Sequence, residues 1–362
     1  MDDLMLRGLL FVAMFSGFFA CVEKPKSELI EINVPDKVNT EITLHDIADS
    51  IQFIQLETRP DAFISRINEV YLHDNKLYIW YVFQKILVFD LDGKFLGALG
   101  KQGDGPGEYR SVSAMAIDDR SGEIYVFANY KFLRYSPKHE LLEEKRMNAS
   151  FDYFRMLDGE RFGISQEYGN EVEGGFANET KLYRLGADIA ILDTLPLRKV
   201  EMEKKIASVL GYTDYISSFG GNHFIYTPVT TNENYLRDTL YQFKDMQLMP
   251  FAKLNFPKPH LDDRGFKKYF IANVVHTANY ISSHFYEKSS LHQFLYHMGS
   301  GEPYYVKDGF LDEDGDRLNL RVLCAEKDLF YFVKSAEYKS GAQEEANPMI
   351  GLVRLKQGRL YP

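Results

Sequence analysis

Cysteine is nearly absent from the chain, because Cys21 and Cys324 are the only two among 362 residues. A framework of several disulfides is therefore excluded, and the fold must depend on a hydrophobic core. Positive charge is also scarce, since 52 Asp and Glu outnumber 42 Lys and Arg and give a formal net charge of −10. This balance argues against nucleic acid as a partner, because binding to phosphate backbones requires a basic surface.

Long apolar runs are missing as well. Residues 9–19 form an apolar run too short to span a bilayer, and no later segment reaches the roughly eighteen apolar residues that a membrane helix needs. Arg7 precedes the run and Ala20-Cys21 follow it, which is the pattern of an export signal. A small residue directly before a cysteine resembles the lipobox of bacterial lipoproteins, in which the cysteine is lipidated. An ordinary cleaved signal with an incidental cysteine is the alternative.

These observations divide the chain into three parts. Residues 1–21 are expected to form a lipoprotein signal peptide that ends at the lipidated Cys21. Residues 22–40 are polar and Pro-containing, as expected of a tether, and residues 41–362 form the folded domain. We therefore expect a lipid-anchored protein of the cell envelope, at the outer membrane, that faces the periplasm or the outside. Cys324 then has no cysteine partner and is expected to be a small buried apolar residue.

Aromatic residues make up 14% of the chain, a composition that suits strands, and a hairpin-like phrase recurs along the sequence. Its clearest copy, residues 86–96, consists of an apolar strand, an Asp-Gly turn and a second strand. Equivalent positions in six copies are Phe89, Tyr135, Leu185, Phe243, Phe294 and Leu355. The copies recur about every fifty residues, and such an array predicts a propeller because one small sheet cannot bury both of its faces alone.

The predicted fold is therefore all-β, a six-bladed β-propeller with short helical insertions. Residues 51–56 alternate between apolar and polar side chains, which indicates a strand. This strand precedes the first full unit, so we expect it to pair with the last sheet and close the ring. Residues 200–210 and 266–275 have the spacing of short amphipathic helices and are the expected insertions.

The most distinctive segment is a glycine-rich loop at residues 100–109, which contains Gly103-Asp104-Gly105-Pro106-Gly107-Glu108-Tyr109. It lacks the Lys-Ser/Thr and the following helix of a phosphate-binding loop, and Glu108 places an acid where phosphate would sit. We therefore expect a tight connection between two units, in which the glycines supply positive φ.

Together with the lipobox and residues 54–58, 89–96 and 311–315, this loop resembles the lipid-anchored six-bladed β-propeller proteins common in gut Bacteroidetes. That group is largely uncharacterised and is related in architecture to NHL-repeat propellers. The resemblance implies a fold and a location in the cell envelope, and it transfers no catalytic residues to this chain.

Aromatic residues on predicted loops are the strongest indication of a binding surface. Aromatic rings bury much apolar area at little cost in entropy. The candidate ligand-binding residues are Tyr212, Tyr215, Phe219, Tyr226, Tyr304 and Tyr305. The first functional hypothesis is therefore a monomeric, non-catalytic binding module for a glycan, a peptide or an envelope protein. A purely scaffolding role in an envelope assembly is also open.

A metal-dependent lyase or hydrolase with its site in the central channel is the alternative function. The weak candidate ligands are His260, His276, His284 and His292, and the last three are eight residues apart. At that spacing they would lie on one face of successive strands. Asp312, Asp314 and Asp316 form an acidic turn that could bind Ca²⁺ or another divalent metal, although the spacing does not fit an EF-hand. No other cofactor is expected.

Overall fold

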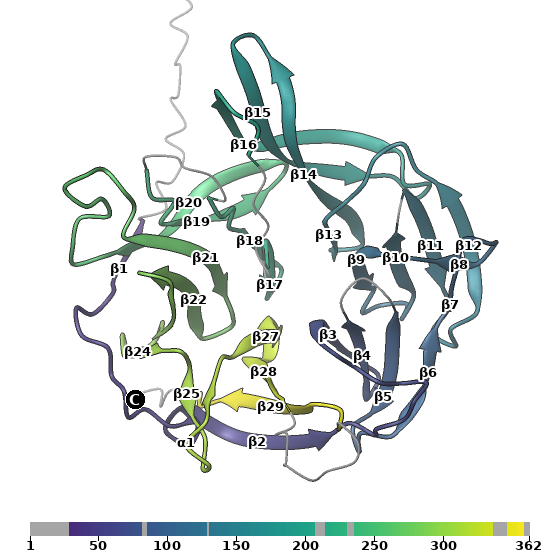
Figure 1. Ribbon diagram of the computed structural model, residues 1–362, viewed down its shortest axis with the longest axis horizontal. Helices are drawn as coiled ribbons and strands as arrows, with labels where there is room; N and C mark the ends of the chain where they lie inside the picture. Colours follow the sequence, from purple (N-terminus) through teal and green to yellow (C-terminus); the bar gives the residue numbers. More distant parts are fainter. Residues whose placement is uncertain are drawn as a thin grey trace, which may run out of the picture.

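The computed structural model describes residues 29–81, 85–128, 130–206, 214–229, 235–335 and 346–357. The regular secondary structure of the described residues is almost entirely β-strand, and the six larger sheets have four or five strands each. Figure 1 shows these sheets arranged in a ring, with β3, β9, β13, β17 and β27 nearest the centre. The first strand of one sheet contacts that of its neighbour at β9 and β13, at β17 and β21, and at β27 and β3. The result is a propeller-like, all-β fold.

Each of the first three large sheets is a four-stranded antiparallel meander. The first contains β3 (Ile67–His73), β4 (Lys76–Tyr81), β5 (Ile86–Asp90) and β6 (Phe95–Leu99). The second contains β9 (Val112–Ile117), β10 (Ile124–Ala128), β11 (Lys131–Tyr135) and β12 (Leu141–Arg146). The third contains β13 (Tyr153–Leu157), β14 (Glu160–Val172), β15 (Gly175–Leu185) and β16 (Ile191–Met202).

The other three large sheets include the two strands contributed by the N-terminal part of the chain. The fourth contains β17 (Ile216–Phe219), β18 (Asn222–Ile225), β19 (Thr239–Lys244), β20 (Gln247–Asn255) and β1 (Ile30–Asn33). The fifth contains β21 (Tyr269–His276), β22 (Tyr280–Glu287), β23 (Ser290–His297) and β24 (Pro303–Lys307). The sixth contains β27 (Arg321–Cys324), β28 (Leu329–Lys334), β29 (Met349–Leu355) and β2 (Ala48–Gln55).

The remaining described elements are short. They are the strand pairs β7 (Lys101–Gln102) with β8 (Glu108–Tyr109) and β25 (Phe310–Leu311) with β26 (Arg317–Leu318), the helix α1 (Leu44–Ile47) and the 3₁₀ turn η1 (Ala325–Lys327). The helix begins at Thr43, whose hydroxyl accepts a hydrogen bond from the backbone of Asp46 in a capping box.

The repeated phrase corresponds to the same strand in each large sheet. Its six marker residues lie on β5, β11, β15, β19, β23 and β29, each the third strand of its sheet when the strands are counted from β3, β9, β13, β17, β21 and β27. These strands read as apolar runs because neighbouring sheets cover both of their faces. On β5, for example, all four residues from Ile86 to Phe89 are fully buried. Leu87 and Phe89 pack toward the sixth sheet, whereas Ile86 and Val88 pack toward the second.

The predicted pairing of residues 51–56 with the last sheet is confirmed for β2. This strand pairs antiparallel with β29, and the register places Phe53 opposite Gly351. A strand near residue 50 and one near residue 350 therefore belong to the same sheet. Asn347 strengthens this junction, because its side-chain amide donates to the carbonyls of Glu57 and Ala62 and its Oδ1 accepts from the backbone of Ile64.

The folded domain begins earlier than residue 41, where the sequence placed its start. β1 (Ile30–Asn33) pairs in parallel with β20, and Ile32 is fully buried in the core of that sheet. Part of the expected tether is therefore a fifth strand. An apolar residue at alternate positions is the only local signal for this strand, and it is too short to distinguish a strand from a polar linker.

The predicted helical insertions are wrong wherever the structure describes them. Residues 269–275 belong to β21, whose Ile271, Val274 and Val275 are buried. Residues 200–202 end β16, and residues 207–210 lie outside the described part. The long hairpin β14–β15 extends the third unit instead, as Figure 1 shows. Short apolar runs suit helices and strands equally, and here the neighbouring sheets decide the outcome.

The glycine-rich loop connects the first and second sheets, as expected. Gly100, Gly103 and Gly107 all have positive φ. The loop is closed by the parallel pair β7–β8, and the Nζ of Lys131 donates to the carbonyls of Gly105 and Glu108 at 3.1 and 2.8 Å. Its carbonyls and amides are thus used within the protein, which agrees with a structural role.

Candidate functional site in the central cavity

A cavity of about 430 Å³ lies where the first strands of the sheets approach one another. Its walls come from five of the six large sheets and from η1. The polar side chains that line it are Glu69, Tyr71, Asp118, Asp119, Arg120, Arg155, Asp158, Asp214, Ser217, Ser218, His223 and Glu326. Acids outnumber Arg in this set by six to two. No single strand could build such a surface, so it depends on the ring arrangement.

Arg155 on β13 is the centre of the cavity floor. Its guanidinium lies 3.7 Å from Oε1 of Glu69 and 3.6 Å from Oδ1 of Asp214. It also lies over the rings of Tyr71 and Tyr153, at 5.7 and 4.9 Å from their centroids. The cation is thus held between two aromatic faces and two carboxylates from three sheets, an arrangement that fixes the guanidinium in place.

The two phenols complete this network. The hydroxyl of Tyr71 donates to Glu69 at 2.6 Å and lies 3.0 Å from the carbonyl of Met115, and the hydroxyl of Tyr153 donates to Asp214. Burial raises the pKa of both Glu69 and Asp214, and the positive charge of Arg155 opposes this shift. The cavity floor therefore combines a fixed cation, carboxylate acceptors and phenols in surroundings where charge is poorly solvated.

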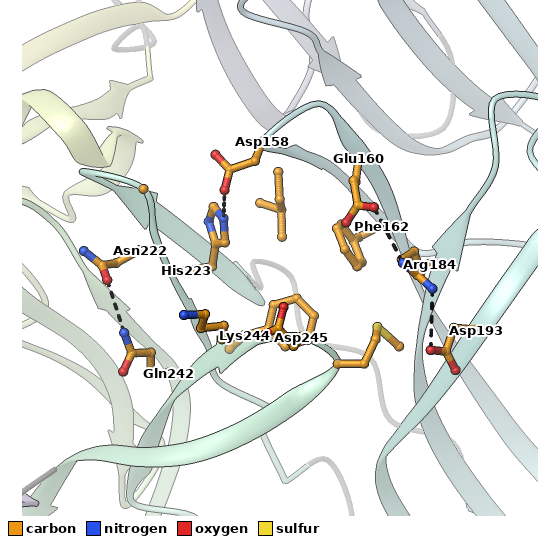
Figure 2. Close-up of a pocket in the computed structure, with 14 residues that line it drawn as sticks. Asp158, Glu160, Phe162, Arg184, Asp193, Asn222, His223, Gln242, Lys244 and Asp245 are labelled. Carbon is orange, nitrogen blue, oxygen red and sulfur yellow. Dashed lines mark hydrogen bonds and ion pairs between the residues drawn. The ribbon is translucent and has the colours of Figure 1, made fainter. Parts of the chain in front are cut away.

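A second cavity of about 490 Å³ adjoins the first between the third and fourth sheets (Figure 2). Leu157, Asp158, Gly221 and His223 line both cavities, so they form the wall between them. Figure 2 shows Asp158 directed at the His223 ring, and Arg184 between Glu160 and Asp193 on the opposite side. The two cavities together could accommodate an extended ligand.

The aromatic residues predicted to bind a ligand do not form one face. Tyr215, Tyr226 and Tyr305 are buried in the core, because strands place them between sheets. Phe219 lines the central cavity and stacks on Phe224, with 5.5 Å between the ring centroids. Tyr304 lines a separate cavity beside His297. Tyr212 lies outside the described residues. Among the five described residues of this set, only Phe219 lines the central cavity.

The four histidines do not form a metal site. Among the described residues, the aspartates 312, 314 and 316 are the only group of three His, Cys, Asp or Glu whose ligand atoms lie within 4.8 Å of one another. His276 is enclosed by Phe219, Phe224 and Phe251, and burial lowers its pKa to about 4.

The other three candidate histidines lie in separate environments. Burial, with the positive charge of Arg321, lowers the pKa of His284 to about 3. His292 stacks on Phe285 with 5.5 Å between the ring centroids. His260 is partly exposed between β20 and β21. The three that are eight residues apart lie on three adjacent strands, but the structure uses them in the packing of the fifth sheet.

The acidic turn has an internal cation. The Nζ of Lys334 lies 2.6, 2.7 and 2.8 Å from carboxylate oxygens of Asp312, Asp314 and Asp316. Burial opposes the shift, but the hydrogen bond from Lys334 lowers the pKa of Asp312. An ammonium group therefore occupies the position that a divalent metal would take between these oxygens.

We expect Lys334→Met to lower the free energy of unfolding by about 1–2 kcal/mol, because three carboxylates lose their common cation. Ca²⁺ should then raise the melting temperature of the variant and leave that of the wild type unchanged. Thermal unfolding with Ca²⁺ and with EDTA checks both statements. A wild-type protein whose melting temperature falls in EDTA would contradict the role given to Lys334.

No motif in the sequence predicted the charged network on the cavity floor. Glu69 and Arg155 stand on the first strands of their sheets, and Asp214 comes two residues before β17. Charged residues inside apolar strands are a sequence signal for such a network. The sequence does not show that these residues converge, because their convergence depends on how the sheets are placed around the ring.

The geometry defines a propeller-like protein with a charged central cavity. The chain belongs to the family described as a domain of unknown function, DUF4934, whose model matches residues 29–356. No curated protein matches the chain.

Matches among solved structures include the following two. A Bacteroides fragilis protein presumed to be exported has 17% sequence identity and a TM-score of 0.65, covering 91% of this chain and 100% of that chain. BamB from Moraxella catarrhalis has 8% identity and a TM-score of 0.43, covering 85% of this chain and 99% of that chain. Within the described residues, no helix has the length and apolar character needed to cross a membrane.

Proposed function

We propose that this protein is a lipid-anchored, six-bladed β-propeller of the cell envelope that binds a glycan in its central cavity without catalysis being required. The six large sheets are interpreted as blades, and the pairing of β2 with β29 as the closure of the ring. The observation that carries the proposal is Arg155, held between two carboxylates and two phenol rings on the floor of the cavity.

A glycan fits the chemistry of the cavity better than an apolar ligand. Sugar hydroxyls donate and accept hydrogen bonds at the same time, and the cavity offers carboxylate acceptors beside guanidinium and hydroxyl groups. A volume of about 430 Å³ accommodates a few sugar rings or the end of a peptide, rather than a flat protein surface. Peptide and protein partners are the other outcomes of the binding experiment.

The N-terminal sequence supports a location in the envelope. Its apolar run and Ala20-Cys21 support export and lipidation, and the similar fold of a Bacteroides fragilis protein presumed to be exported is in agreement. Cys21 is only nine residues from β1, so the extended tether spans at most about 30 Å. The edge of the fourth sheet would therefore stay close to the membrane.

We expect Cys21→Ser to abolish attachment of the lipid and to release the protein from the membrane fraction. Acyl chains supply the apolar area that holds a lipoprotein on a bilayer. Metabolic labelling with an alkyne fatty acid, followed by fractionation, measures both effects. Labelling that persists in the variant would contradict lipidation at Cys21.

We expect Asp119→Asn, combined with Arg120→Ala, to weaken glycan binding by about tenfold, or roughly 1.4 kcal/mol. Both side chains line the rim of the cavity, and that of Asp119 is 96% exposed, so the fold should tolerate the change. The matched control is Asp104→Asn on the glycine-rich loop, whose carboxylate is also exposed and lies outside this cavity.

The measurement is a thermal-shift screen of the purified protein against oligosaccharides, peptides and divalent metals, with and without EDTA, followed by calorimetry on each hit. Stabilisation by an oligosaccharide that depends on the rim residues supports the proposal. Stabilisation by peptides alone would replace the glycan with a peptide. A response to metals that EDTA reverses would instead favour a metal-dependent lyase or hydrolase over a glycan-binding module.

A further inference from the structure

A hydrogen-bonded triad lies at the rim of the central cavity and consists of Ser218, His223 and Asp158. The Oγ of Ser218 lies 2.9 Å from Nδ1 of His223, and Nε2 of His223 lies 2.9 Å from Oδ2 of Asp158. Ser218 and His223 face each other across the hairpin β17–β18. Asp158 belongs to the turn between β13 and β14, so these hydrogen bonds link the third and fourth sheets.

The order of these groups determines where the protons lie. A carboxylate only accepts hydrogen bonds, so the imidazole nitrogen beside Asp158 carries the proton. The other nitrogen, Nδ1, then has a free lone pair and accepts the hydroxyl proton of Ser218. A hydroxyl that donates to a base oriented by a third group is the arrangement of an activated nucleophile.

The surroundings leave this hydroxyl open to a ligand. Ser218 and His223 both line the central cavity, and Asp158 forms the wall shared with the second cavity (Figure 2). The His223 side chain is 14% exposed, so the base is largely shielded, whereas the Asp158 side chain is 64% exposed. Asp158 should therefore contribute less than His223, because water competes for its hydrogen bonds.

We propose that Ser218 is the nucleophile of a hydrolase that cleaves carboxylic esters in this cavity. The Oγ of Ser218 forms a bond to the ester carbonyl carbon while its proton passes to Nδ1 of His223. The bond from carbon to the alcohol oxygen then breaks, and the alcohol leaves with that proton. Water attacks the acyl-serine in the same way and releases the acid, which restores the Ser218 hydroxyl.

The charge of the rim restricts the substrate. The carboxylates of Asp119, Asp158 and Glu326 line the same cavity and disfavour anionic alcohols. An acyl ester of an uncharged, hydroxyl-rich alcohol is therefore the expected class. That choice rests on the proposed glycan ligand, whereas the activated serine does not.

The protein contains a second serine–histidine pair that serves as a control for the Ser218–His223 pair. The Oγ of Ser300 also lies 2.9 Å from Nδ1 of His297. There, however, the backbone N–H of Ser300 donates to the same Nδ1 at 2.9 Å, so the lone pair is already used. Ser300 should therefore stay inert although it is beside a histidine.

The test treats the full-length protein with a fluorophosphonate probe, which reacts with activated serines, and locates the modified residue by peptide mass spectrometry. We expect the probe on Ser218 in the wild type and in Ser300→Ala, and none on Ser218 in His223→Ala. Hydrolysis of p-nitrophenyl acetate should fall by about 100-fold in Ser218→Ala and His223→Ala, and by less in Asp158→Asn.

Circular dichroism melting of each variant separates loss of chemistry from loss of fold, and Ser218→Ala removes only one oxygen atom. A wild-type protein that is not labelled at Ser218, or labelling that is unchanged in His223→Ala, would overturn the proposal. Neither outcome bears on glycan binding, which is measured separately with the Asp119 and Arg120 variants.

Discussion

Replacing Gly351 by alanine should destabilise the protein by about 3 kcal/mol or more, because the new methyl group has no space. Gly351 lies on β29 between Phe53 of β2 and Phe332 of β28. A Cβ at this position would lie 1.9 Å from Cζ of Phe332, whose ring is 1% exposed in the core. Phe53 lies edge-on to this ring with 5.9 Å between the ring centroids, so an outward movement of Phe332 must also displace Phe53.

Urea unfolding of Gly351→Ala measures this effect, and Gly351→Ala with Phe332→Leu is its internal control. The smaller side chain removes the clash, so the double variant should recover about 1–2 kcal/mol relative to the sum of the single variants. Additive losses would show that the ring above Gly351 is not the cause. The site also tests the sheet that joins the first and last parts of the domain, because Gly351 is paired with a residue of each neighbouring strand.

The repeat could be read from the sequence because each copy carries the same local chemistry. Phe89, Tyr135 and the other marker residues lie on the third strands of their sheets and are themselves buried, and this burial leaves a visible apolar pattern. The strand β1 and the segment 269–275 could not be assigned in this way. Ile30–Asn33 becomes a strand only because the edge of β20 is available to it. The apolar residues of β21 fit either type of structure until the adjacent sheets fix them.

The candidate site was less predictable than the fold for a related reason. Aromatic residues such as Tyr215 and Tyr226 are conspicuous in the sequence, but their size makes them suitable for the core. Glu69, Arg155 and Asp214 are separated by many residues and belong to three sheets. Ser218 and His223 are five residues apart across a hairpin, whereas Asp158 comes from another sheet. Such combinations arise from the ring and have no local motif.

Replacing Arg155 by methionine should lower the free energy of unfolding by about 2–3 kcal/mol near neutral pH. Without the guanidinium, Glu69 and Asp214 lose the cation that offsets the cost of their burial. Their side chains are 21% and 9% exposed, so water replaces it only in part. Arg134→Met is the matched control, since Arg134 on β11 also pairs with two carboxylates, Glu123 and Glu143, but within the second sheet and outside the central cavity. It should cost at most about 1 kcal/mol.

The effect of pH distinguishes the loss of the Arg155 positive charge from the loss of its packing. Burial raises the pKa of Glu69 and Asp214 in the folded state, so folding favours their protonated forms and stability falls as the pH rises through these values. Removal of the positive charge of Arg155 should raise both pKa values further. The deficit of Arg155→Met should therefore shrink when the pH is lowered from about 7.5 to about 5. Urea unfolding at the two pH values measures it, and an equal deficit at both would indicate packing alone.

The same network allows stability to be separated from binding. Burying charges is costly, and replacing a whole buried ionic group by uncharged residues is often neutral or stabilising. The triple variant Arg155→Met, Glu69→Gln and Asp214→Asn should therefore regain most of the stability that Arg155→Met loses. If the network is present for a ligand, the triple variant should still fail to bind the oligosaccharide that stabilises the wild type. Recovery of both stability and binding would mean that these charges serve the fold alone, and that the ligand lies elsewhere on the ring.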